Sequence, residues 1–171
     1  MFTIIACCSC LLFHIILFAP QIPPNTGNII RLSANTGATL HLIEPLGFRL
    51  DEKSCRRAGL DYHTLADLHL HKNMDDCMTT LSAARLFAIT SHGAASVFDN
   101  QFAPGDAFLF GSETTGLPDA VHARFDASQK LRLPMIAGNR SLNLANAASI
   151  VVYEAWRQTG FAVAEKDPKF V

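Results

Sequence analysis

Three loop segments of this chain carry the residue types and spacing expected of a ligand-binding site. They are dense in glycine, proline, serine, threonine and asparagine: Pro20 to Asn28, Gly111 to Pro118 (GSETTGLP) and Pro134 to Asn146 (PMIAGNRSLNLAN). Each follows a short apolar run that predicts a buried strand. In a parallel sheet, the loops after the carboxyl ends of the strands gather at one edge and form the site. One such loop alone would be ordinary turn chemistry, but three at the same edge indicate a binding site.

The first of these loops is stiff and polar, where a nucleotide-binding loop is usually rich in glycine. The run before it, Phe13 to Ala19 (FHIILFA), is short, β-branched and aromatic, which is typical of a buried strand. A helix is predicted to follow, because Asn25 and Thr26 are good N-cap residues and Gly37 is a good residue for its end. Pro23 and Pro24 would fix the direction in which the chain enters that helix.

Several well-known sites are excluded by their missing motifs. No G-x-G-x-x-G follows the first strand, no G-x-x-x-x-G-K-[ST] is present, and no G-x-S-x-G nucleophile elbow occurs. Glu44 ends the second predicted strand, where dinucleotide-binding folds hold a ribose, but alone it is a weak signal. His69 and His71 would share one face of a short strand, as metal ligands do. Without a third ligand, an exposed strand face is the favoured interpretation.

Strands and helices alternate along the chain, which predicts an α/β fold with a parallel sheet and helices on both faces. The predicted strands are Phe13 to Ala19, Ala38 to Ile43, His69 to His71, Arg85 to Thr90, Ala107 to Phe110 and Leu131 to Pro134. The predicted helices begin after the caps Asn25 or Thr26, Asp51, Asn73 and Asn143 and end near Gly37, Arg57, Ser82 and Gln158. No internal repeat or linker interrupts the pattern.

The last predicted helix is apolar on nearly all sides. Its apolar members are Leu144, Ala145, Ala147, Ala148, Ile150, Val151, Val152, Tyr153, Ala155 and Trp156. Such a helix must be covered on nearly all sides, and one small domain covers a single face. We therefore expect a second subunit to cover the other face, although a central helix buried within one chain would also satisfy the pattern.

Composition places the chain among ordinary globular proteins of one domain. It has 171 residues, of which 49% are hydrophobic and 17% charged, and its formal net charge is −1. This charge balance excludes a strongly basic protein that binds nucleic acid over its whole surface, but it permits a local basic patch. The candidates for that patch are Arg49, Lys53, Arg56, Arg57, Lys130, Arg132 and Arg140.

The cysteines and the N-terminal residues carry little functional signal. Five cysteines do not form a secreted disulfide framework, and the single C-x-x-C of Cys7 and Cys10 has no second pair to complete a zinc site. The apolar segment Ile4 to Pro20 lacks a preceding Lys or Arg and is too short for a membrane span. We interpret residues 1–11 as an extension outside the domain, 12–160 as the domain, and 161–171 as a tail.

The loops, read together, resemble a known enzyme family. PPNTGNIIR, FGSETTGLP and LPMIAGNRSLNLANAASIVVYEAWRQ are similar to the three signature motifs of the SPOUT class of RNA methyltransferases. Within that class the chain resembles the TrmL-type tRNA (cytidine/uridine-34) 2′-O-methyltransferases, and RRAGLDYH, Arg56 to His63, adds to the match. The resemblance covers about Leu12 to Gly160. It implies a deep trefoil knot in the C-terminal half, one of the few exceptions to the rule against knots.

The resemblance also implies the cofactor and how it is held. The family binds S-adenosylmethionine, bent and contacted largely by backbone atoms, and it needs no metal because the methyl donor is already a sulfonium. By motif position, the contacts come from Ile89, Gly111, Leu133 and Ser141, while Gly116 and Leu142 shape the same pocket. Glycine and small residues suit places where the backbone must approach a ligand closely.

The catalytic role falls by resemblance on Arg31, presented by the first helix. Arginine is effectively always charged, so binding the RNA phosphate and lowering the pKa of the hydroxyl suits it better than acting as a base. A helix-surface ion pair is its structural alternative. Arg140 would contact substrate phosphate or pair with a carboxylate. Asn28 and Asn143 are expected to hydrogen-bond across the loops, with Glu113 tying the second motif to them, and Tyr153 is expected near a subunit interface.

The implied activity is 2′-O-methylation of the wobble nucleotide of tRNA by a cytoplasmic homodimer, with leucine tRNAs as the expected substrates. The anticodon loop would be the part of the tRNA that is bound, with no membrane involved. Methylation at another tRNA or rRNA site is the alternative within the class. A non-catalytic knot protein that binds RNA or cofactor is the alternative outside it, and a degraded motif would favour it; all three motifs are intact.

Overall fold

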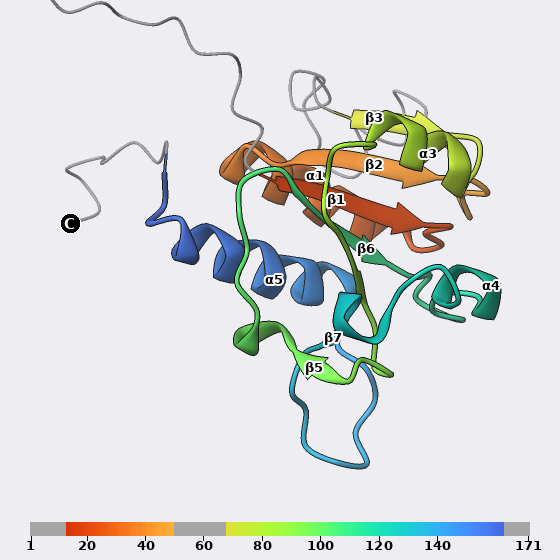
Figure 1. The fold of residues 1–171 in the computed structure, drawn as a ribbon. Helices are drawn as coiled ribbons and strands as arrows, with labels where there is room; N and C mark the ends of the chain where they lie inside the picture. Colours follow the sequence, from red (N-terminus) through yellow and green to blue (C-terminus); the bar gives the residue numbers. More distant parts are fainter. Residues whose placement is uncertain (1–12, 50–67, 163–171) are drawn as a thin grey trace, which may run out of the picture.

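The protein is built on a single sheet of parallel strands. The structure, a computed structural model, describes residues 13–49 and 68–162. Seven strands lie in the order β3-β2-β1-β6-β4-β7-β5, and each neighbouring pair is parallel (Figure 1). Their bounds are β1 Phe13–Phe18, β2 Thr39–Ile43, β3 Leu68–His71, β4 Leu86–Ile89, β5 Ala95–Ser96, β6 Asp106–Phe110 and β7 Lys130–Arg132. The predicted parallel α/β sheet is thus confirmed.

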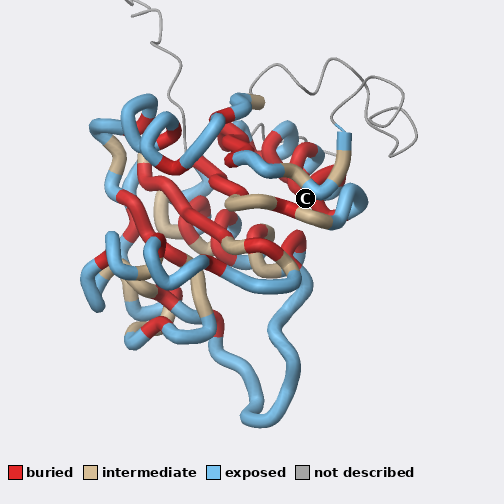
Figure 2. The backbone as a smooth tube through the Cα atoms, turned by 90° about the vertical axis from the view of Figure 1, so that its right-hand side faces the viewer, coloured by how far each residue is buried: buried red, intermediate tan, exposed pale blue. Residues whose placement is uncertain are grey.

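Helices cover both faces of this sheet and give it two hydrophobic cores. The helical elements are α1 Pro23–Thr36, α3 Met74–Thr80, η2 Val97–Asp99, α4 Asp119–His122, η3 Ala127–Gln129 and α5 Leu144–Gln158. Along β1, Ile15 and Leu17 face the core under α1 and α5, whereas Ile16 faces the core under α3 and α4. Burial on both faces explains why the central strands are continuously apolar instead of alternating. Figure 2 shows the buried residues, in red, running through the middle of the molecule.

The start of α1 differs from the prediction. The helix begins at Pro23, with Ile22 as its N-cap residue and no side-chain cap, so Asn25 and Thr26 are not the N-caps. Two prolines are accommodated in the first turn, where their missing N–H groups would have had no helical partner. Gly37 ends the helix as predicted, in the left-handed conformation with φ 70°, and its N–H donates to the Ser33 carbonyl.

The other two predicted helix caps that the structure describes are confirmed. The Asn73 side chain accepts from the Asp76 N–H, and that of Asn143 accepts from the N–H groups of Ala145 and Asn146. The α3 helix stops at Thr80, short of Ser82. Four short elements, β5, η2, α4 and η3, are absent from the predictions because two to four residues carry no periodicity. The predictions for residues 1–11, Asp51 to Arg57 and Arg56 to His63 lie outside the described residues.

The α5 helix is covered largely by its own chain. Ala148, Val152 and Ala155 are fully buried against α1 and the sheet, and Trp156 is 8% exposed. The α1 helix and β6 thus cover one side of α5, and the expected cover of its other side by a second subunit stays a prediction. Only Ile150, at 37%, and Tyr153, at 45%, are large apolar side chains of α5 that remain exposed. No helix among the described residues is both long and apolar enough to span a bilayer.

The strand β3 is not the exposed face that its histidines predicted. His69 is exposed, but His71 is buried beneath α3 and beside His41 of β2. Burial and the nearby His14, His69 and His71 lower the pKa of His41 to about 3, so its imidazole is neutral near pH 7. These buried polar rings lie among the largely apolar side chains of the sheet.

A buried carboxylate fixes the start of β6. Asp106 is 2% exposed and accepts from Arg85 Nε at 2.7 Å, Arg85 Nη2 at 2.6 Å and the Ala103 N–H at 2.8 Å. The paired arginine compensates the desolvation of this charge, and the hydrogen bond to Asp106 raises the pKa of Arg85. The pair joins the beginnings of β4 and β6, two neighbouring strands of the sheet.

Removing this arginine should destabilise the fold more than removing a surface arginine. In Arg85→Met the alkyl stem remains while Asp106 keeps its buried charge without a cation, so the free energy of unfolding should fall by about 2–3 kcal/mol. Arg124, paired with the exposed Asp75, is the matched control, and Arg124→Met should cost less than about 1 kcal/mol. Urea unfolding measures both, and equal losses would contradict this account of the pair.

Candidate functional site

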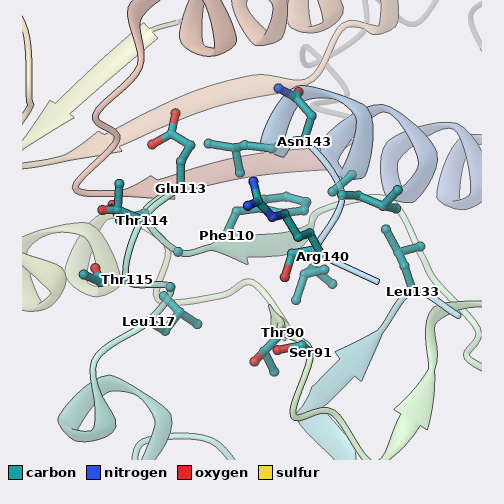
Figure 3. A pocket seen from close by; sticks show the side chains of 18 of the residues that line it. Thr90, Ser91, Phe110, Glu113, Thr114, Thr115, Leu117, Leu133, Arg140 and Asn143 are labelled. Atoms are coloured by element: carbon teal, nitrogen blue, oxygen red, sulfur yellow. The ribbon is translucent and has the colours of Figure 1, made fainter. Parts of the chain in front are cut away.

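A pocket of about 650 Å³ opens at the carboxyl ends of three strands. Ile89 ends β4, Phe110 ends β6, and Leu133 follows β7 directly. All three loops singled out from the sequence contribute to its lining, together with the residues after β4. The lining residues are Ile22, Asn25, Ile89 to His92, Phe110 to Leu117, His122, Leu133, Met135, Arg140 to Leu144 and Ala147 (Figure 3). The predicted convergence of the loops at one sheet edge is confirmed.

The second loop forms a tight turn against its own backbone. Ser112 and Gly116 exchange two backbone hydrogen bonds, at 3.1 and 2.9 Å, and Gly116 adopts φ 69°. A Cβ atom placed on Gly111 would lie 2.3 Å from the Gly116 carbonyl carbon and 2.4 Å from the Leu117 nitrogen. Residue 111 must therefore be glycine for a reason internal to the protein: the turn folds directly over it.

Glu113 connects this turn to the first loop. Its carboxylate accepts from the Gln21 N–H at 2.8 Å, from the Ile22 N–H at 3.2 Å and from Asn25 Nδ2 at 2.9 Å. Asn25 is separated from Glu113 by 88 residues, so the contact is purely tertiary. Glu113 therefore ties the second motif to the first loop, through Gln21, Ile22 and Asn25 in place of the expected Asn28 and Asn143.

Asn143 extends the same network to the third loop. Its Nδ2 donates to Asn25 Oδ1 at 2.8 Å, while its Oδ1 caps α5. The first-loop residue in contact with Asn143 is thus Asn25, and the expected bond to Asn28 is wrong, because Asn28 points away from the sheet and is exposed. Asn25 lies buried on the inner face of α1, one turn earlier.

The third loop is the most exposed wall of the pocket. Residues 134–143 are all exposed, and the loop between β7 and α5 extends from the body of the molecule (Figures 1 and 2). Ile136 is 82% exposed, and Met135 and Leu142 are each 41% exposed. Arg140, Ser141 and Leu142 come from this loop into the pocket lining. Apolar side chains in so open a loop are typical of a segment that a ligand or partner covers.

The charges of the pocket lie on different loops. The Glu113 carboxylate accepts hydrogen bonds from three N–H donors. Arg140 contributes a permanent positive charge to the wall of the pocket. His92 and His122 stand edge to face beside the opening, with ring centroids 6.0 Å apart. This arrangement suits a ligand that contacts backbone atoms and a mixture of apolar and polar side chains, with an anion bound beside Arg140.

The structure brings together all six residues that the resemblance assigned to cofactor binding. Ile89, Gly111, Gly116, Leu133, Ser141 and Leu142 all line the pocket, as do Arg140 and Asn143. Arg31, Asn28 and Tyr153 do not line it. Arg31 and Asn28 lie exposed on α1, one turn apart, and Tyr153 lies on the outer side of α5.

One wall of the pocket lies outside the three loops selected from the sequence. Thr90, Ser91 and His92 follow β4, and the Thr90 N–H donates to the Leu131 carbonyl at 2.8 Å. Ser91 and His92 follow the predicted strand Arg85 to Thr90, as the three selected loops follow theirs, so their position after a strand was a usable signal, whereas Thr90 was predicted to be part of the strand itself. They lack the density of glycine, proline and asparagine that drew attention to the other loops.

The chain matches known proteins over most of its length. Residues 12–153 match the SpoU rRNA methylase family. A relative from Burkholderia ambifaria, named tRNA (cytidine(34)-2′-O)-methyltransferase, is 57% identical over 152 residues, covering 88% of this chain and 97% of the relative. A relative of the same name from Methylovorus glucosotrophus is 52% identical over 153 residues, covering 90% and 99%.

Solved structures of RNA methyltransferases share the fold of this chain. One, from work on the 2-OH methylation of C/U34 on tRNA, is 45% identical with a TM-score of 0.80 and covers 87% of this chain and 97% of its own. Another is the SpoU methyltransferase AviRb from Streptomyces viridochromogenes in complex with AdoMet. It is 30% identical with a TM-score of 0.73 and covers 85% of this chain and 57% of its own.

Substituting Gly111 should damage the pocket without unfolding the protein. In Gly111→Ala the new Cβ displaces the turn at Gly116 and Leu117, so we expect affinity for S-adenosylmethionine to fall about tenfold or more. Gly105 is the matched control, because it has φ 89° and open space around a Cβ, far from the lining residues. Gly105→Ala should lower thermal stability through backbone strain and leave the affinity unchanged. Calorimetry on both variants decides, and unchanged affinity in Gly111→Ala would refute the assignment.

Proposed function

The chain belongs to the SpoU rRNA methylase family, and we propose that it methylates the ribose 2′-hydroxyl of nucleotide 34, cytidine or uridine, in tRNA. The observation that carries this conclusion is the convergence of all three motif loops on one pocket, in a chain more than half identical to tRNA (cytidine(34)-2′-O)-methyltransferases. Those relatives are matched over nearly their full length. The structure from work on C/U34 methylation shares the fold over nearly its whole chain.

The residues of the pocket fit S-adenosylmethionine. Because the turn folds directly over Gly111 and Gly116 takes a left-handed conformation, backbone N–H and carbonyl groups line the wall where side chains would otherwise stand. Ile89, Leu133 and Leu142 supply apolar surface for an adenine ring, and Ser141 adds a hydroxyl. When bound, S-adenosylmethionine supplies a methyl group on a positively charged sulfur, already activated for transfer.

The protein's tasks are then to position the hydroxyl and to help remove its proton. The bond from the 2′-oxygen to the methyl carbon forms as the carbon–sulfur bond breaks, and the hydroxyl proton leaves to a base or to water. The network of Glu113, Asn25 and Asn143 holds the loops in place for this step. Arg140 lines the pocket and is suited to bind a phosphate of the RNA.

Arg31 acts as the catalytic charge from a second copy of the chain. It lies exposed on α1 and outside the pocket of its own chain, while α1 packs beside α5 on the same face of the sheet. Ile150 and Tyr153 on α5 provide exposed apolar surface there. In a homodimer through this face, Arg31 of one subunit would reach the pocket of the other. Its positive charge would bind the RNA phosphate and lower the pKa of the 2′-hydroxyl.

The same proposal covers the substrate and its recognition. We expect leucine tRNAs to be the main substrates. Their anticodon loop would lie across the dimer and contact Arg140 and the exposed Asn28. Tyr153 would pack at the interface between the two subunits. Single-stranded loops present their riboses openly, so a compact enzyme can reach them without an appended domain. We assign the activity to residues 12–160 and the protein to the cytoplasm, where tRNA is modified.

A deep knot is also part of the proposal. In the sheet, β7 lies between β4 and β5, although it follows both in the chain. A Cβ atom on Gly93, in the connection from β4 to β5, would lie 2.5 Å from the Leu131 carbonyl carbon, so the two segments lie in direct contact. A chain that passes between two strands joined by an earlier connection is what a trefoil knot requires.

The activity is tested on tRNA directly. In tRNA from cells lacking this protein, nucleoside mass spectrometry should show loss of the 2′-O-methyl group at position 34, first in leucine tRNAs. The purified chain with S-adenosylmethionine should restore it. Methylation of another nucleotide would show that the protein is a 2′-O-methyltransferase for a different RNA site. Binding of RNA without methyl transfer would contradict the proposed activity.

The dimer is tested by placing a charge on its proposed interface. Ile150→Glu should yield a monomer that still binds S-adenosylmethionine but does not transfer methyl groups, because burying an unpaired charge costs several kcal/mol. Met78 on α3 is equally exposed, at 37%, and lies on the opposite side of the sheet, so Met78→Glu should remain dimeric and active. Light scattering and an activity assay check both variants, and a fully active wild-type monomer would contradict the proposal.

Mixing two impaired variants, at a limiting concentration of S-adenosylmethionine that Gly111→Ala binds poorly, separates action in trans from action in cis. Arg31→Ala keeps an intact pocket, and Gly111→Ala keeps an intact arginine. A mixed dimer then holds one complete site, so an equimolar mixture after subunit exchange should recover about a quarter of wild-type activity. No recovery after verified exchange would place Arg31 at the pocket of its own chain.

A further inference from the structure

A cluster of buried imidazoles and a thiol lies under α3, apart from the pocket. His14 on β1, His41 on β2 and His71 on β3 stand side by side across three neighbouring strands. His14 Nδ1 is 3.1 Å from His41 Nε2, and His41 Nδ1 is 3.0 Å from His71 Nε2. Cys77 of α3 packs over them and is fully buried. None of the four residues lines the pocket, so the proposed methyl transfer leaves them without a role.

Three of these side chains converge as metal ligands do. One ligand atom from each of His41, His71 and Cys77 lies within 4.8 Å of the others, and the three residues are at most 4% exposed. They come from two strands and a helix, so their convergence is a tertiary feature and not a local sequence motif. Imidazole nitrogens and thiolates are typical ligands of zinc, whereas calcium and magnesium bind oxygen ligands.

We propose that His41, His71 and Cys77 form a zinc-binding site that clamps α3 and the edge strand β3 onto β2. The two imidazole nitrogens nearest each other, 3.0 Å apart, would be ligands. A tetrahedral ion at about 2.0–2.1 Å from each nitrogen would hold them about 3.3 Å apart, so the rings need to separate by only a few tenths of an ångström. A fourth ligand would come from water or from an exogenous donor.

The second nitrogen of His41 already has the hydrogen-bond partner that a metal-bound imidazole needs, and the second nitrogen of His71 lies near a carboxylate. With Nδ1 on the metal, His41 would donate its Nε2–H to His14 Nδ1. With Nε2 on the metal, His71 would direct its Nδ1–H towards Asp76 Oδ2, which lies 3.8 Å away. Asp76 is itself held by the Lys72 N–H at 3.2 Å. Carboxylate and imidazole acceptors behind metal-bound histidines orient the rings and strengthen binding.

The proton balance of binding is simple. Each neutral imidazole carries one N–H with or without the ion, so the histidines only exchange tautomers. The thiol of Cys77 loses its proton when it becomes a ligand, and that proton passes to solvent. Binding therefore releases a single proton and needs no oxidant or reductant.

The consequence would be structural, at the β3 edge of the sheet. Strand β3 has four residues and pairs with β2 alone among the described strands, and α3 has seven residues. Elements so short have little cooperative stability of their own. An ion bound to β2, β3 and α3 would stabilise all three against local unfolding by the free energy of binding.

Zinc uptake by the full chain tests this site. Untagged protein in which Cys7, Cys8, Cys10 and Cys55 are replaced by serine leaves Cys77 as the only thiol. After chelator treatment, zinc titration followed by elemental analysis should give close to a single ion per chain and a raised Tm. Cobalt in place of zinc should give a thiolate-to-cobalt charge-transfer absorption, which reports Cys77 as a ligand.

Matched variants decide between a zinc site and a hydrogen-bonded ladder of histidines. In the same background, Cys77→Ala and His71→Asn should each lose the thermal stabilisation by zinc, while His69→Asn, an exposed neighbour on the same strand, should keep it. Affinity for S-adenosylmethionine shows that each variant is folded. Stoichiometric zinc-dependent stabilisation that survives in Cys77→Ala, or no zinc uptake by the parent protein, would overturn the site and leave the ladder alone.

Discussion

One carboxylate, that of Glu113, holds the functional end of the molecule together. Through Gln21, Ile22 and Asn25 it binds the first loop, and through Asn25 the network reaches Asn143 and the start of α5. The third loop is exposed along residues 134–143, so packing alone does not fix its position. The mutual position of the three loops depends on hydrogen bonds that are partly shielded from water, where losing one partner leaves the others unsatisfied.

The sheet makes this network possible by bringing distant segments to one edge. Parallel strands that are buried on both faces place all their carboxyl ends on the same side, so the loops after β1, β4, β6 and β7 meet there although they are far apart in sequence. The two cores under α1 with α5 and under α3 with α4 keep the edge rigid. A pocket lined by backbone atoms requires such rigidity, since small shifts of main chain alter every contact with a ligand.

The two faces of the sheet carry residues with different proposed roles. The face under α1 and α5 carries the exposed Arg31, Ile150 and Tyr153, and the proposed partner subunit completes the site there. The face under α3 carries the histidine cluster, at the sheet edge farthest along the strand order from β7 and β5. Joining the short β3 and α3 to the sheet is a separate structural problem from binding cofactor, and different side chains serve it.

The sequence by itself determined the parallel α/β class, most strands, the caps Asn73 and Asn143, the end of α1 at Gly37 and the three loops of the pocket, because these follow from local periodicity and turn chemistry. Tertiary structure decided the rest. Asn25 is a link between loops instead of a helix cap, since Glu113 lies within reach of it only in the fold. Gly111 is required by the turn that crosses it, Ala148 and Val152 are buried by their own chain, and His71 meets Cys77 under α3. Each depends on contacts between residues distant in sequence, which no local pattern encodes.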